Sequence, residues 1–154
     1  MITTQEIIGD IWDKWKEGFW IVIPTNGFVN NKGECTMGAG LALQAKTKFP
    51  DLPKELAERL EEYGNVVFTF HKYHLITFPV KRVWWERANP ELIKRSCKDL
   101  QKIFEHNLSG IPLPLYLPRV GCGNGKLKWT DVKPILEKYL DERFVVCDNG
   151  QNRA

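Results

Sequence analysis

The chain has 154 residues, a mass of 17.9 kDa and a formal net charge of +3. This length predicts one domain, and the 43% of hydrophobic residues can form a buried core, which excludes a disordered chain. The small net charge excludes a protein that binds nucleic acid non-specifically over most of its surface, but it is compatible with a local anion site.

Six short runs rich in apolar, β-branched and aromatic residues predict strands. They comprise residues 6–11, 19–24, 65–70, 73–78, 113–117 and 143–147. Because helical patterns lie between most of them, we predict an α/β protein with a largely parallel or mixed sheet.

Four stripes of apolar residues at helical spacing predict the helices. The stripes are Met37, Leu41, Ala45 and Phe49; Leu52, Leu56 and Leu60; Ile93, Cys97, Leu100 and Phe104; and Trp129, Val132, Leu136 and Leu140. Pro50 separates the first two helices, since proline breaks a helix interior. Asn89 is a good N-cap for the third helix with Pro90 at its first position, and Thr130 is expected to cap the fourth.

We predict one domain over residues 1–148, followed by a polar tail at residues 149–154. The four cysteines have neither CxxC nor Cys/His spacing, so no disulfide framework and no metal site is predicted. The N-terminus lacks the pattern of a signal peptide, and the longest strongly apolar run, residues 19–24, is too short for a bilayer. We therefore expect a cytoplasmic protein without membrane contact.

Small residues follow the second predicted strand. Thr25-Asn26-Gly27 leads to Gly38-Ala39-Gly40 at the start of a helix. The free amide groups and the dipole of a helix start favour a phosphate or a ribose oxygen. These glycines alone are weak evidence, because they could equally ease the packing of the helix on the sheet.

A second loop rich in glycine lies between the fifth strand and the last helix. It reads Pro118-Arg119-Val120-Gly121-Cys122-Gly123-Asn124-Gly125. Glycines at alternate positions form a concave run of backbone donors that suits a diphosphate, at the end of the sheet where ligands bind. The loop matches neither the GxGxxG fingerprint nor a Walker loop, so it contains no known nucleotide-binding motif. The number of glycines nevertheless favours a phosphate-bearing ligand over a purely structural turn.

With these segments in place, the chain resembles the macrodomain family, whose members bind ADP-ribose. The resemblance rests on Ile8-Gly9-Asp10-Ile11, on Asn26 and on both glycine loops, in the family's order. The segments most similar to the DarG antitoxin macrodomains, and to their relatives the terminal ADP-ribose glycohydrolases, are residues 37–44 with Lys48-Phe49-Pro50, residues 78–82 and residues 121–129. The resemblance implies a three-layer α/β/α fold with a mixed sheet of about six strands.

The resemblance also implies a set of site residues and no cofactor. Asp10 would accept a hydrogen bond from the adenine amino group, and Lys81 matches the catalytic lysine of the DarG pattern FPTKxHW. The implied catalytic residues are Lys81 and Asn26, and Asn26 would hold the distal ribose. Ligand-binding positions are implied for Asp10, Ile11, Gly38, Ala39, Gly40, Pro118, Gly121, Cys122, Gly123, Asn124 and Gly125. A lysine beside the anomeric carbon can attack it after ring opening, or help protonate the departing base, if its pKa is lowered.

The chain departs from the family pattern at four positions. Ile23 replaces an asparagine, and Val83 replaces the histidine of FPTKxHW. In the terminal glycohydrolase branch the assisting aspartate corresponds to Gly125 and the lysine to Phe78, so that pair of groups is lacking here.

For several other residues a structural role is an alternative to a functional one. Trp84 and Trp85 could stack on adenine or on an extruded base, although one of such a pair is more often core and the other a partial cover. His71 and His74 are predicted on opposite faces of a strand, where they are poor joint metal ligands. Arg82, Arg119, Lys126 and Lys128 add positive charge near the expected ligand. Cys122 has no sequence partner that would make it a nucleophile.

Three functions remain open from the sequence. The first is an ADP-ribosyl hydrolase of the DarG type, which removes ADP-ribose from a nucleobase, thymidine in single-stranded DNA, with Lys81 central. The second is a hydrolase of ADP-ribose-1″-phosphate or of O-acetyl-ADP-ribose, which would retain much of its rate without Lys81. The third is a non-catalytic ADP-ribose reader. A DNA-binding module of another fold is disfavoured, since no helix carries a basic stripe.

Overall fold

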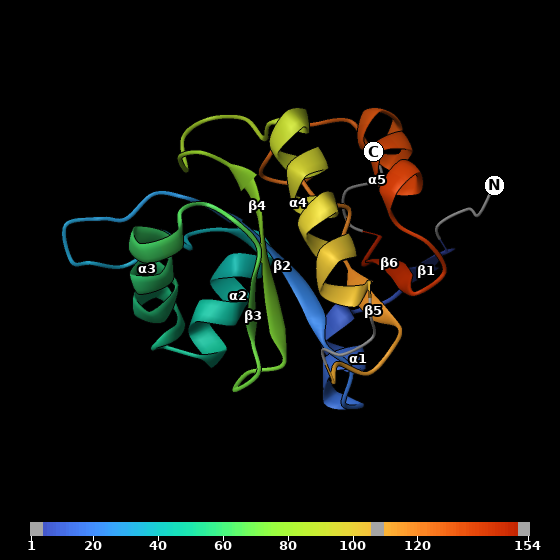
Figure 1. The fold of residues 1–154 in the computed structure, drawn as a ribbon, viewed down its shortest axis with the longest axis horizontal. Coiled ribbons are helices and arrows are strands. Elements are labelled where there is room, and N and C mark those ends of the chain that lie inside the picture. Colours follow the sequence, from blue (N-terminus) through green and yellow to red (C-terminus); the bar gives the residue numbers. More distant parts are fainter. Residues whose placement is uncertain (1–4, 106–109, 151–154) are drawn as a thin grey trace.

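The structure, a computed structural model, describes residues 5–105 and 110–150. The strands are β1 (Gln5–Ile8), β2 (Ile21–Asn26), β3 (Phe68–Phe70), β4 (Leu75–Lys81), β5 (Leu115–Leu117) and β6 (Phe144–Asp148). The helices are α1 (Ile11–Lys16), α2 (Gly40–Lys48), α3 (Leu52–Tyr63), α4 (Pro90–Phe104) and α5 (Trp129–Tyr139) (Figure 1). Most of the predicted tail, residues 151–154, lies outside the described residues.

The six strands form one mixed sheet in the order β1-β6-β5-β2-β4-β3. All neighbouring pairs are parallel except β3 with β4, which is antiparallel and puts the short β3 at one edge. This arrangement confirms the predicted α/β class and the mixed sheet.

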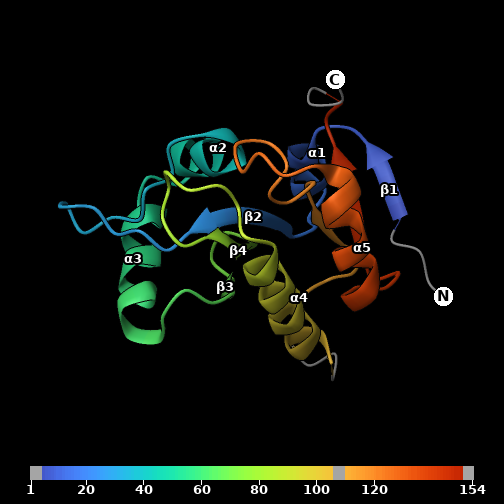
Figure 2. The ribbon, with the colours of Figure 1, turned by 90° about the horizontal axis from the view of Figure 1, so that it is seen from above.

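Helices cover both faces of the sheet, so the protein has three layers (Figure 2). Side chains alternate along β2: Val22 packs with α4 and α5, whereas Ile21 and Ile23 pack with α1, α2 and α3. Strands buried on both faces read as continuous apolar runs, which is why these runs were recognisable in the sequence. Among the described residues, no helix is long and apolar enough to cross a membrane.

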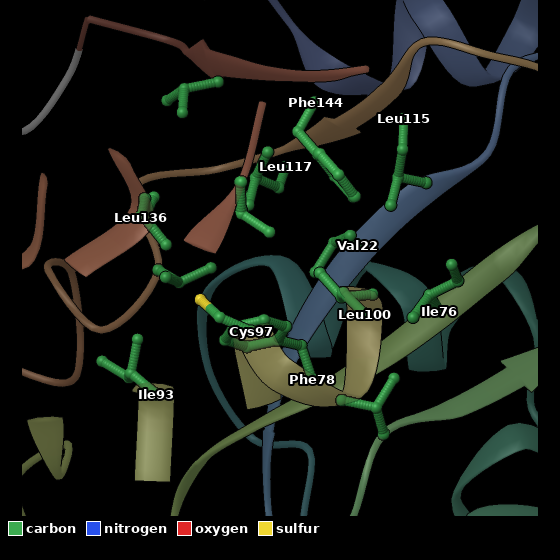
Figure 3. Packing of buried hydrophobic residues seen from close by; sticks show 14 of the residues in the cluster. Val22, Ile76, Phe78, Ile93, Cys97, Leu100, Leu115, Leu117, Leu136 and Phe144 are labelled. Carbon is green, nitrogen blue, oxygen red and sulfur yellow. The ribbon is translucent and has the colours of Figure 1, made fainter. Parts of the chain in front are cut away.

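The core on the α4 and α5 side contains the stripe that predicted α4. Ile93, Cys97 and Leu100 are fully buried and pack against β2, β4 and β5 (Figure 3). The Asn89 side chain accepts a hydrogen bond from the Glu91 amide at 2.9 Å, and Pro90 is the first helical residue. The prediction for this helix, including its N-cap, is therefore confirmed.

Helix α1 was not predicted, and the strand expected over residues 6–11 is wrong at its end. The strand stops at Ile8, and the Asp10 carboxylate accepts a hydrogen bond from the Trp12 amide at 3.0 Å, which caps a helix that begins at Ile11. The apolar residues on both sides of Gly9-Asp10 gave the appearance of one continuous strand. Trp12 and Trp15 donate their indole N–H groups to Gln44 and to the Tyr73 carbonyl, so α1 is also fixed by tertiary contacts.

Three smaller expectations differ from the structure. Strand β4 continues through Pro79 to Lys81, because a bulge opposite Thr25 and Asn26 accommodates the proline. The N-cap of α5 is Lys128, without a side-chain hydrogen bond, and Thr130 lies inside the helix. His71 and His74 are not on a strand: they lie in the turn between β3 and β4, and both rings contact Trp20, at centroid distances of 4.7 and 5.5 Å.

Candidate functional site

A cleft of about 1780 Å³ opens at the carboxyl ends of the parallel strands. The chain leaves β2 toward α2 on one face of the sheet and leaves its neighbour β5 toward α5 on the other. Such a divergence of connections opens the crevice at which α/β proteins bind ligands. The volume exceeds the roughly 300–1,000 Å³ of ordinary small-molecule sites, so an extended ligand fits.

Every residue that the sequence predicted for the site lies on the wall of this cleft. They come from the strand ends and the loops that follow them, and comprise Asp10, Ile11, Asn26, Gly38, Ala39, Gly40, Lys81, Pro118, Gly121, Cys122, Gly123, Asn124 and Gly125. Arg119, Lys126 and Lys128 also line the cleft, whereas Arg82 does not and pairs with Glu86 at 3.2 Å.

Arg87 and Asn149 are among the further lining residues that the sequence analysis did not assign to the site. They follow β4 and β6 in the chain, so the rule that ligands bind beyond parallel strand ends would have found them had the strand ends been known.

Lys81 lies at the end of β4, directly across from Asn26 on β2. Thr25 pairs with Pro79 and Asn26 with Lys81, so a bulge omits Val80 from the register. Without the bulge Val80 would face Asn26. The Ser96 hydroxyl donates to the Pro79 carbonyl at 2.7 Å, and the Asn89 amide donates to the Val80 carbonyl at 2.8 Å. Helix α4 therefore fixes the bulge that positions the lysine.

The Lys81 ammonium group is held by backbone oxygens. Its side chain is buried, and Nζ donates to the carbonyls of Trp84 and Asn124, each at 3.3 Å. Among the described residues, no carboxylate lies within 4.0 Å of this nitrogen. Burial, and then the positive charge of Lys126, lower the pKa of Lys81 below its ordinary value. The cleft thus contains an amine that loses its proton more readily than a surface lysine does.

The Asn26 side chain holds the segment that follows β2. Its Nδ2 donates to the Thr36 carbonyl at 2.9 Å and its Oδ1 accepts from the Phe28 amide at 2.9 Å. The amide nitrogen has two hydrogens, so one remains for a ligand in the cleft. The structure therefore gives this buried asparagine an internal positioning role that the sequence did not reveal.

Helices α2 and α5 both begin at the cleft without a side-chain cap. Gly40, the first residue of α2, has φ of 55°, a left-handed conformation that glycine adopts without strain. Free amide groups at a helix start, together with the helix dipole, attract an anion. Two such helix starts on opposite sides of the crevice suit the two charges of a diphosphate.

Packing explains two glycines of the loop after β5. A Cβ atom on Gly121 would lie 2.8 Å from Ile93 Cδ1, and one on Gly125 would lie 2.5 Å from the Gly121 carbonyl oxygen. These glycines are therefore required by the compactness of the loop itself, whatever its ligand. A Cβ on Gly38 would meet only Thr36 Cγ2, at 4.0 Å.

Cys122 and Arg119 have structural partners in the same loop. Burial raises the pKa of the Cys122 thiol to about 11, which keeps it protonated and unreactive at neutral pH. Arg119 forms an ion pair with Glu6 on β1 and lies over the Trp129 ring, 5.0 Å from its centroid. These contacts connect the loop after β5 to the edge strand and to the start of α5.

The positions that depart from the family pattern lie mainly in the core. Ile23 and Phe78 are fully buried on opposite faces of the sheet, and Val83 is also buried. None of these three lines the cleft. Among the described residues, no group of three or more His, Cys, Asp or Glu side chains is placed to hold a metal ion.

Comparison with known proteins identifies relatives over most of the chain. The DNA ADP-ribosyl glycohydrolase of Thermus aquaticus is 29% identical over 140 residues, which cover 83% of this chain but 38% of that protein. The ADP-ribose glycohydrolase OARD1 of Bos taurus is 30% identical over 112 residues, which cover 70% of this chain and 69% of that protein. The chain thus spans well under half of the first relative. No family model matches it.

The fold is shared with solved structures. The macrodomain of Thermus aquaticus DarG superposes with a TM-score of 0.72 and 24% identity, and the match covers 95% of this chain and 97% of that one. At 24% sequence identity the structural similarity establishes the fold alone. The position of the cleft follows from the strand order of this chain and does not depend on the comparison.

Proposed function

This chain belongs to the macrodomain family, and we propose that it is an ADP-ribosyl glycohydrolase that removes ADP-ribose from a nucleobase, with thymidine in single-stranded DNA as the substrate. The observation that carries the proposal is the buried Lys81 amine at the cleft, held by two carbonyl groups and with a lowered pKa. The names of the relatives support the reaction class, since one is a DNA ADP-ribosyl glycohydrolase and one an ADP-ribose glycohydrolase.

The order of the strands supports an extended orientation for the ligand. Asp10 follows β1, whereas Lys81 ends β4, and β6, β5 and β2 lie between these strands. Four interstrand spacings amount to roughly 19 Å. In our proposal adenine lies near Asp10, the diphosphate between the starts of α2 and α5, and the distal ribose beside Asn26 and Lys81.

The lysine acts on the anomeric carbon of that ribose. The neutral Nζ attacks this carbon, the bond between the carbon and the base breaks, and its electron pair leaves with the base, which takes up a proton. Ring opening gives an imine on Lys81, and water hydrolyses it to release ADP-ribose and the free amine. The buried position favours the neutral amine that this attack requires.

The test is the release of free ADP-ribose from an oligonucleotide that carries ADP-ribose on thymidine, followed by chromatography. We expect release from this strand and slower release, or none, from ADP-ribose-1″-phosphate and O-acetyl-ADP-ribose. Faster turnover of either small substrate would replace the proposal with the corresponding small-molecule hydrolase. Binding of ADP-ribose by calorimetry with no turnover of any substrate would identify a reader.

The proposed chemistry predicts how the rate depends on pH. If the neutral amine reacts, kcat rises with pH to a plateau above the pKa of Lys81. Lys126 lowers that pKa, so Lys126→Asn should raise it, move the rise in kcat to higher pH and reduce the rate at neutral pH. Asparagine is chosen because Lys126 has φ of 64°, which asparagine tolerates.

The matched control for this pH profile is Lys138→Gln. Lys138 is an exposed lysine in the last turn of α5, away from the cleft, so its loss changes the net charge equally. An equal displacement of the profile in both variants would attribute the effect to net charge and contradict the local role of Lys126.

A further inference from the structure

Two tryptophans are exposed at the rim of the cleft. The exposed fractions of Trp84 and Trp85 are 50% and 59%, so the expectation that one of them is core is wrong. The other large exposed hydrophobic residues of the described ranges, Ile8, Leu43, Tyr63 and Leu113, do not line the cleft. Contiguous exposed apolar surface marks an interaction site, whereas single scattered apolar residues need no explanation.

The two rings continue into a third aromatic side chain from another loop. Trp85 contacts Phe28 at a centroid distance of 5.2 Å, and Trp84 contacts Trp85 at 5.4 Å with the planes 84° apart. Because the two indole rings meet edge to face and are not stacked, their contact leaves ring faces uncovered. We call Phe28, Trp84 and Trp85 the aromatic ridge.

The backbone that carries the ridge is fixed on both sides. Val83 and Ala88 are buried, and the Ala88 amide donates to the Gly125 carbonyl at 3.0 Å. The Gly27 amide donates to the Arg82 carbonyl at 3.1 Å, and Lys81 Nζ donates to the Trp84 carbonyl. The tryptophans are therefore exposed on an ordered loop, which lowers the entropic cost of binding.

Positive charge lies next to the ridge. Arg87 follows Trp85 by two residues and donates to the Lys126 carbonyl at 2.9 Å, which brings the two exposed cations together. Lys128 lines the same cleft, and Glu86 pairs with Arg82. Exposed aromatic faces beside cations are the combination that binds single-stranded nucleic acid, in which the bases stack and the phosphates pair with the cations.

We propose that the aromatic ridge binds unpaired bases of the strand that flank the modified nucleotide, while Arg87, Lys126 and Lys128 contact its phosphates. This inference rests on the proposed function for its choice of a nucleic-acid strand. Duplex DNA is excluded as the occupant, because its bases stack on one another and do not present their faces. The ridge thus selects the single strand and presents the modified base to Lys81.

Direct binding tests the ridge independently of catalysis. The probe is a short fluorescein-labelled oligothymidine strand without ADP-ribose, measured by anisotropy at low and at physiological salt. We expect wild-type protein to bind it more tightly than the matching duplex, with an affinity that falls as salt rises. Trp85→Ala should weaken binding by about 5- to 150-fold, the effect of losing one base stack.

The control is Tyr63→Ala, which removes an exposed aromatic ring at the end of α3, outside the cleft. It should bind the strand as wild-type protein does. Equal affinity of Trp85→Ala and wild-type protein, equal affinity for single strand and duplex, or no binding at all would each overturn the proposal. None of these results depends on turnover, so a failure of the proposed function is distinguishable from a failure of the ridge.

Turnover provides the second arm. For Trp85→Ala, kcat/KM should fall on an ADP-ribosylated oligonucleotide far more than on the ADP-ribosylated mononucleoside, which has no flanking bases. An equal loss on both substrates would show that Trp85 acts at the reacting nucleotide and would contradict the flanking-base assignment. A loss confined to an ADP-ribosylated peptide would identify a protein partner instead.

Discussion

Lys81→Met should abolish turnover and leave ADP-ribose binding largely intact. Methionine retains most of the volume of the buried side chain but has no amine to form a bond with the anomeric carbon or to move a proton. Loss of proton transfer alone costs about 10²- to 10⁴-fold in rate, and loss of a covalent step adds to it. Release of ADP-ribose from the modified oligonucleotide measures the rate, and calorimetry with ADP-ribose measures binding.

The structure gives a reason to expect intact binding. Lys81 Nζ contacts two carbonyl groups of the protein, and the diphosphate is assigned to the helix starts of α2 and α5, which the substitution leaves unchanged. Loss of both binding and turnover would instead indicate collapse of the loops that the lysine bridges. A variant as active as wild-type protein would remove Lys81 from the mechanism.

Chemical trapping distinguishes a Lys81 amine that forms a bond with the anomeric carbon from one that only protonates the departing base. A covalent imine on Lys81 is reduced by borohydride to a stable secondary amine, so peptide mass spectrometry should find ADP-ribose attached to Lys81 only in reactions with substrate. Turnover without trapped peptide would favour a lysine that protonates the departing base.

The elements that the sequence predicted well are those whose pattern and ends are both local. Helix α4 has an apolar stripe, an Asn89 cap and Pro90, and each signal lies within a few residues of the others. Helix α1 was not predicted for the opposite reason: it has only six residues, and contacts of Trp12 and Trp15 with distant segments stabilise it. Helices this short depend on tertiary packing, which a local pattern does not contain.

The site was predictable to the extent that it consists of strand ends. Asn26, Lys81 and Pro118 end or directly follow parallel strands, so once the fold class is known they must lie at one edge of the sheet. The register between them was not predictable, because the bulge that places Lys81 opposite Asn26 depends on Pro79 and on its contact with α4. The exposure of Trp84 and Trp85 also depends on how their loop is anchored.

The glycine loop provides the second large expected effect. Gly125→Ala should destabilise the protein by about 1–3 kcal/mol and should abolish ADP-ribose binding. The added Cβ would lie 2.5 Å from the Gly121 carbonyl oxygen and 2.7 Å from the Ala88 Cβ, distances that no side-chain rotation relieves. Urea unfolding measures the loss of stability, and calorimetry with ADP-ribose measures binding.

Relief of this clash breaks the hydrogen bonds that shape the loop. The Gly121 carbonyl accepts from the Leu127 amide at 3.0 Å, and the Gly125 carbonyl accepts from the Ala88 amide at 3.0 Å. The loop must therefore open away from the segment that carries Trp84 and Trp85, and the backbone donors assigned to the diphosphate move with it. A change in stability without a change in binding would mean that these donors do not hold the ligand.

The control for stability is Gly38→Ala on the opposite side of the cleft. Its Cβ would make only an ordinary contact with Thr36 Cγ2 at 4.0 Å, so the free energy of unfolding should change by less than about 0.5 kcal/mol. Equal destabilisation of the two variants would mean that both glycines are needed for general backbone reasons and that the contact with Gly121 is unimportant. A large difference would show that Gly125 is required by packing within the loop. The number of glycines in the sequence does not distinguish this requirement from the need for a ligand to approach the backbone closely.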